Sequence, residues 1–161
     1  MLHFVLAALL AATPAPANPQ IDYPGFRELT LSVEDYRRTR LVDWKGFEAA
    51  AAQPDALILD ARSASAFARG HIKGAVNLPF TDFTDESLAA VIGGKDRPIL
   101  IYCNNNFRND EPPVPVKSVR LALNIQTFIN LVGYGYANVR ELNEVVDFND
   151  PKVRWVKGSL S

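Results

Sequence analysis

Short apolar runs alternate with amphipathic segments along most of this chain, and the alternation predicts its fold. Five runs rich in aliphatic, β-branched or aromatic residues predict strands at 41–42, 56–59, 74–79, 99–102 and 138–142. Helices are predicted between them, at 44–53, 64–68, 82–92 and 117–132, from apolar residues at helical spacing. Strands that alternate with helices in this way indicate an α/β fold of three layers, with a central parallel sheet flanked by helices.

Residues that cap helices mark several of these boundaries. Asp43 and Ser63 stand where helix N-caps are expected, and Gly70 and Gly133 stand at helix ends. The segment 117–132 is the strongest helix candidate because it carries a wide apolar stripe, made of Leu121, Ile125, Phe128, Ile129 and Val132.

The segments outside this alternation have a different character. Residues 18–27 contain two prolines and a glycine and predict an irregular arm, while 29–40 show partial helical spacing. Residues 109–115 contain three prolines and two acidic residues and predict a loop. The apolar run 153–156 is expected to pack back on the domain.

The first seventeen residues are typical of a secretory signal peptide. Residues 4–12 form an apolar core that is too short to span a bilayer, and Ala15-Pro16-Ala17 supplies the small residues of a cleavage site after Ala17. We therefore expect a signal peptide at 1–17, an N-terminal arm at 18–40 and a single domain at 41–161. The mature protein is expected in the periplasm or outside the cell, with no membrane span after cleavage.

Composition and charge narrow the possible functions. The chain has 161 residues, 48% of them hydrophobic, which is enough for one core, and a net charge of −1 indicates no nucleic-acid surface. The cluster of Arg37, Arg38 and Arg40 is interpreted as a solvated helix face. With one cysteine and two histidines the chain cannot form an internal disulfide, and we expect no metal and no cofactor.

That single cysteine, Cys103, stands directly after the predicted strand 99–102 and begins a polar loop of Asn104, Asn105, Asn106, Phe107 and Arg108. A strand that ends in a thiol and a loop rich in turn-forming residues is where an α/β protein places a nucleophile. We expect all five loop residues, 104–108, to bind the substrate. Backbone N–H groups and asparagine amides are expected to form an anion site there, and Arg108 either binds an acidic group of a substrate or braces the loop. The alternative for a lone cysteine is a small buried apolar side chain.

Four motifs occur in order along the chain. They are Asp60-Ala61-Arg62, the run 70–79 (Gly-His-Ile-Lys-Gly-Ala-Val-Asn-Leu-Pro), Ile101-Tyr102-Cys103, and 135–139 (Gly-Tyr-Ala-Asn-Val). Together they resemble the rhodanese-like sulfurtransferase family over roughly 41–142. The resemblance implies a parallel sheet with the thiol at its carboxyl edge. It also implies that Asp60 and Arg62 support the rim of the site. Gly70-His71-Ile72 itself predicts a turn in which the imidazole ties the backbone together, so His71 is expected to support the structure rather than to act as a base.

Two features depart from the family pattern. Residues 109–116 are inserted before the last helix, and Asn143-Glu144 replace a Gly-Gly pair. The first leaves open whether that helix still points its N-terminus at the sulfur, and it provides a possible surface for a protein partner.

The expected function is transfer of sulfane sulfur from thiosulfate or a similar small anion to a thiol or cyanide acceptor, through a persulfide on Cys103. One alternative is a catalytically silent rhodanese-like module that binds or senses redox state. Another is phosphatase-like chemistry, for which the spacing of Cys103 and Arg108 is one residue short.

Overall fold

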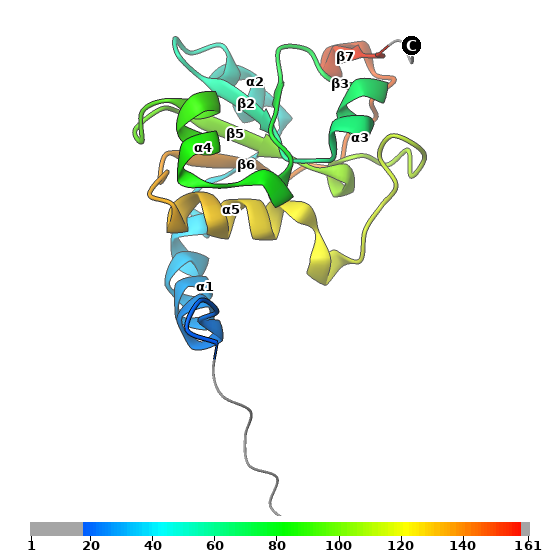
Figure 1. The fold of residues 1–161 in the computed structure, drawn as a ribbon. Helices are drawn as coiled ribbons and strands as arrows, with labels where there is room; N and C mark the ends of the chain where they lie inside the picture. Colours follow the sequence, from blue (N-terminus) through cyan, green and yellow to red (C-terminus); the bar gives the residue numbers. More distant parts are fainter. Residues whose placement is uncertain (1–17, 159–161) are drawn as a thin grey trace, which may run out of the picture.

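The computed structural model describes residues 18–158, so the predicted signal peptide at 1–17 lies outside the described residues. Its centre is a five-stranded sheet in the order β1-β6-β5-β2-β4, in which every strand pair is parallel (Figure 1). The strands are β1 (Leu41–Val42), β2 (Leu57–Asp60), β4 (Val76–Asn77), β5 (Ile99–Tyr102) and β6 (Val139–Leu142). The predicted α/β class with a central parallel sheet is confirmed.

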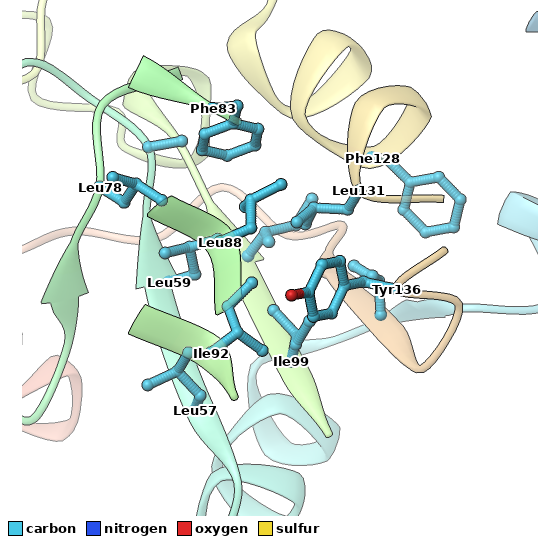
Figure 2. Close-up of a cluster of buried hydrophobic side chains, with 13 residues drawn as sticks. Leu57, Leu59, Leu78, Phe83, Leu88, Ile92, Ile99, Phe128, Leu131 and Tyr136 are labelled. Atoms are coloured by element: carbon cyan, nitrogen blue, oxygen red, sulfur yellow. The ribbon is translucent and has the colours of Figure 1, made fainter. Parts of the chain in front are cut away.

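Five α-helices accompany the sheet, and two apolar cores fill the space on its two faces. The helices are α1 (Tyr23–Arg38), α2 (Trp44–Ala51), α3 (Ala64–Arg69), α4 (Asp85–Ile92) and α5 (Leu123–Gly133). One core joins Leu59, Ile99 and Ile101 of the sheet to side chains of α4 and α5 (Figure 2). The other joins Ile58, Leu100 and Tyr102 to α2 and the C-terminal segment. Because alternate residues of β2 and β5 enter opposite cores, both central strands are buried along their whole length.

The C-terminal segment returns to the domain, as predicted for 153–156. Strand β7 (Trp155–Val156) pairs antiparallel with β3 (His71–Ile72), and Val153 is fully buried. Gly70 is required at this contact, since a Cβ there would lie 2.4 Å from the indole nitrogen of Trp155.

The N-terminal arm is more regular than its composition predicts. Helix α1 begins at Tyr23, inside the stretch expected to be irregular, because Asp22 accepts a hydrogen bond from the Gly25 N–H (2.9 Å) and a proline in the first turn needs no donor of its own. The helix packs on α5, where the rings of Tyr36 and Phe128 lie 6.2 Å apart (Figure 1). Within residues 18–158, no helix has the length and apolarity needed to cross a membrane.

Helix α5 begins at Leu123, six residues later than predicted. The main chain of Lys117 is held from both sides by the Asn105 amide, which donates to its carbonyl (2.8 Å) and accepts from its N–H (3.1 Å). A 3-10 turn, Val119–Leu121, then leads to the helix, so Leu121 is 64% exposed instead of facing the core. Side-chain bonds to the loop therefore override the apolar periodicity over 117–122.

Candidate active site

Cys103 lies at the carboxyl end of β5, between the ends of β2 and β6, as a nucleophile in a parallel α/β fold is expected to lie. Its side chain is 1% exposed and forms part of the wall of a cavity of about 210 Å³. Asn105, Asn124 and Glu141 contribute to the same wall. The thiol is thus buried but borders a space large enough for a small molecule.

Burial is the main influence on the thiol and raises the pKa of Cys103 above its ordinary value. The backbone N–H groups of Asn124, Asn105 and Leu123 act in the opposite direction, and the carboxylate of Glu141 adds to the increase. Leu123 and Asn124 are the first two residues of α5, so the inserted segment leaves the N-terminus of that helix directed at the sulfur. These N–H groups favour a negative charge on the sulfur, but the effect of burial prevails and the pKa of Cys103 stays above its ordinary value.

An ion pair that the sequence did not reveal lies beside the thiol. Glu141 on β6 is 4% exposed and accepts hydrogen bonds from both Nε (2.6 Å) and Nη2 of Arg37 in α1. Both residues belong to the wall of the Cys103 cavity. The interpretation of Arg37 as part of a solvated helix face was therefore wrong. The available signal was a glutamate inside an otherwise buried predicted strand, which requires a partner.

The three asparagines of the loop act mainly as internal braces. Asn106 accepts from the Cys103 N–H (2.8 Å) and the Asn124 amide (3.0 Å), and it donates to the carbonyls of Leu142 (2.7 Å) and Glu144 (3.1 Å). Asn104 donates to the Pro115 carbonyl (2.9 Å). Most of their amide groups are thus committed to the protein, and the Asn105 N–H of this loop acts on the sulfur.

The structure does not bring Phe107 and Arg108 to the thiol, in contrast to the predicted substrate-binding role. Phe107 is 1% exposed and packs edge-on against Tyr102 and Trp155 in the second core. Arg108 is exposed, and its N–H donates to the Val146 carbonyl (3.0 Å). Neither residue forms part of the Cys103 cavity. An aromatic residue in a polar loop is drawn into the nearby core because its burial is worth about 1.5–3 kcal/mol.

Asp60 and Arg62 form a buried ion pair at the end of β2. The guanidinium Nη2 lies 2.6 Å from the carboxylate and also donates to the Gly70 carbonyl (2.8 Å), while Nη1 donates to the Pro113 carbonyl (3.2 Å). The Tyr102 hydroxyl donates to the same carboxylate. Burial opposes the charge on Arg62, but the contacts with Asp60 prevail and raise its pKa, so the guanidinium stays ionised. This network connects β2, β5 and the inserted segment.

His71 lies away from the thiol. Its Nδ1 is 2.9 Å from the Phe67 carbonyl, and its ring stacks on that of Phe67 with the centroids 3.8 Å apart. Within residues 18–158, no cluster of three or more histidine, cysteine or acidic side chains is arranged to hold a metal ion.

Comparison with known proteins identifies the class. The sequence model of the rhodanese-like domain matches residues 43–144, and the chain belongs to that family. A thiosulfate sulfurtransferase from Pseudomonas aeruginosa shares the fold at 19% identity and a TM-score of 0.52; the match covers 84% of this chain but only 23% of that protein. A rhodanese-like domain of an Anabaena sp. protein is 27% identical, with a TM-score of 0.46 and coverage of 64% and 67% of the two chains. No curated protein matches the sequence.

Proposed function

We propose that this protein is an exported sulfurtransferase that carries a sulfane sulfur as a persulfide on Cys103. The observation that supports this most directly is the position of the thiol at the N-terminus of α5, beside a cavity, with the N–H groups of Asn105, Leu123 and Asn124 acting on the sulfur. Such N–H groups stabilise a thiolate and equally a persulfide anion. Membership of the rhodanese-like family and the shared fold with a thiosulfate sulfurtransferase agree with this chemistry.

The proposed transfer has two steps. The Cys103 thiolate attacks the outer sulfur of thiosulfate, a new S–S bond forms, and sulfite leaves with the electron pair of the bond that breaks. An acceptor thiolate or cyanide then attacks the outer sulfur of the persulfide, and the Cys103 thiolate is released. Arg37 balances the charge of Glu141 on the cavity wall and so reduces repulsion of an anionic donor.

The apolar segment at 1–17 supports the proposed location in the periplasm or outside the cell. Few free thiols occur in proteins of these compartments, because they are oxidising. A lone cysteine that is kept there, buried to 1% exposure, fits a protected nucleophile.

Intact mass spectrometry tests the proposal directly. Mature protein incubated with thiosulfate is expected to gain about 32 Da, the mass of one sulfur atom bound at a reactive thiol, and to lose it on addition of cyanide. Cys103→Ser is the matched control and should show no gain. Absence of an adduct on the native protein with thiosulfate and with other sulfane donors would contradict the proposed reaction.

A silent binding or redox-sensing module is the second candidate, and specific observations favour it. Burial and Glu141 both raise the pKa of the thiol, and most amide groups of the loop side chains form hydrogen bonds within the protein. If this candidate holds, a protein partner recognised through residues 109–116 binds the Cys103→Ser variant as well as the native chain, and thiosulfate leaves no sulfur on Cys103.

A further inference from the structure

A second and larger cavity lies between α3 and the inserted segment. Its volume is about 520 Å³, within the range of small-molecule sites. Ser63 and Ser65 lie on the α3 side, and Pro113, Pro115 and Lys117 lie on the side of the inserted segment. Cys103 borders the smaller cavity and does not contribute to the lining of this one, so the two spaces are distinct.

The wall formed by the inserted segment is held in place by side chains from elsewhere in the domain. Arg62 donates to the Pro113 carbonyl, Asn104 donates to the Pro115 carbonyl, and Asn105 bonds both main-chain groups of Lys117. Val114, between these points, is fully buried. The cavity is therefore largely formed in advance, which lowers the entropic cost of binding.

The charge of the lining has one sign. Arg62, Arg69 and Lys117 contribute to it, and no acidic residue does. Arg62 is neutralised by Asp60, whereas Arg69 and Lys117 form no ion pair within residues 18–158. Glu111 borders a neighbouring hollow, which also contacts Arg69. Two cations without partners, together with serine hydroxyls, favour an anionic ligand.

An unsatisfied acceptor provides a second, independent indication of a ligand. Asn104 is 8% exposed, and its amide orientation is fixed because Nδ2 donates to Pro115. Its Oδ1 is buried without a hydrogen-bond partner within the described chain. Leaving such an acceptor unpaired costs about 1–3 kcal/mol, and native proteins usually satisfy it. Asn104 forms part of the cavity wall, which places this unpaired acceptor at the border of the space.

Apolar side chains complete the lining. Pro115 and Leu123 contribute to it, and so does Leu121, which is 64% exposed. The position of Leu121 follows from the late start of α5, so the same feature that displaces this residue from the core brings it to the cavity.

We propose that this cavity binds a small amphipathic organic anion. A carboxylate or sulfonate lies between Arg69 and Lys117, an N–H or O–H group donates to Asn104, and an apolar body packs against Pro115 and Leu121. The proposal does not depend on sulfur transfer, because none of the residues that it uses contributes to the lining of the Cys103 cavity.

A fluorescence titration of the mature protein with anilinonaphthalene sulfonate tests the site. This probe has a sulfonate, an N–H group and an aromatic body; phenylnaphthylamine has the same rings and N–H group without the charge. We expect one molecule of the sulfonate to bind, with a dissociation constant that rises about three- to tenfold in Arg69→Ala and in Lys117→Ala and with added salt. The uncharged probe should bind more weakly and show no change in these variants.

Two controls make the outcome decisive. Lys45→Ala removes an exposed cation on α2 that does not contribute to the cavity lining, and it should leave the affinity unchanged. Cys103→Ser should also bind as the native chain does, which separates this proposal from the proposed function. Equal affinity for both probes, no binding of the sulfonate to the native protein, or unchanged affinity in both cavity variants would overturn the proposal.

Discussion

Two arginine–carboxylate pairs flank the thiol, one at the end of each strand that neighbours β5. Asp60–Arg62 lies on the β2 side and Arg37–Glu141 on the β6 side, and both pairs join two guanidinium nitrogens to one carboxylate. The pairs look alike chemically, but their surroundings differ. The Arg62 side chain is 2% exposed and has additional carbonyl partners, whereas the Arg37 side chain is 30% exposed and, among residues 18–158, bonds only Glu141.

The more buried pair supports the structure, whereas the more exposed pair influences the reactivity of the thiol. Arg62 and Asp60 form hydrogen bonds with Gly70, Pro113 and Tyr102, so the pair joins segments that are distant in the sequence. Glu141 contributes instead to the raised pKa of Cys103, and its partner borders the same cavity. A buried ion pair is not in itself evidence of stabilisation; what matters is which other groups depend on it.

Breaking the first pair should have the largest effect on stability. Asp60→Asn leaves the buried Arg62 guanidinium without its counter-charge and is expected to lower the free energy of unfolding by about 3–5 kcal/mol, measured by urea denaturation. Glu34→Gln, which breaks an exposed pair with Arg38, is the matched control and should change little. A loss below about 1 kcal/mol for Asp60→Asn would contradict the conclusion that this pair is needed to hold the joined segments together.

Asn106 is the uncharged brace on the opposite side of the thiol. Asn106→Ala removes four hydrogen bonds and leaves the Cys103 N–H and two carbonyls unpaired, so we expect a loss of about 2–4 kcal/mol in the same measurement. Asn105→Ala removes only the two bonds to Lys117, in a more exposed position, and should cost about 1 kcal/mol. Equal losses in the two variants would show that burial of the brace is unimportant.

The same contrast explains which parts of the site the sequence could predict. Strand β5 has the predicted bounds because its four residues are apolar and bury on both faces. Asp60 and Arg62 are two residues apart after a strand, so their proximity can be inferred from local geometry. Arg37 and Glu141 are 104 positions apart and meet only because α1 packs on α5. No local pattern encodes that contact.

The structure around the Cys103 loop also differs from the sequence prediction because of contacts between segments. Apolar periodicity predicted a helix from 117, but the Asn105 amide bonds the main chain of Lys117 and delays α5. The place of Phe107 and Arg108 after the cysteine predicts that they contact the substrate. The path of the loop, with Phe107 drawn into the second core and bridged to Val146, takes both away from the thiol.

Removing the charge of the second pair should alter reactivity more than stability. Glu141→Gln leaves Arg37 able to turn toward solvent, so we expect a loss of only about 1 kcal/mol. The carboxylate that helps to raise the thiol pKa is gone, so Cys103 should react with iodoacetamide several-fold faster at neutral pH. The control is Glu144→Gln, which removes a carboxylate of the same cavity that accepts from the Trp44 N–H (2.7 Å). A slower reaction in Glu141→Gln than in the native protein would contradict the conclusion that Glu141 lowers the reactivity of the thiol.

The smallest expected effect is a pH dependence of stability due to Cys103. The folded state holds its thiol proton to a higher pH than the unfolded chain, where the cysteine pKa is about 8.5. The stability that this provides is complete below the unfolded value and is lost as the pH rises through the folded value, so the free energy of unfolding should decline above about pH 8. Cys103→Ser should lack this part of the decline, and Glu141→Gln should reduce it because it lowers the folded pKa. The Tyr102 pKa is raised well above its ordinary value, so measurements below about pH 10 exclude its contribution. An identical pH slope in native protein and Cys103→Ser would mean that the thiol is not held in its protonated form, and the contrast between the two ion pairs would then rest on stability alone.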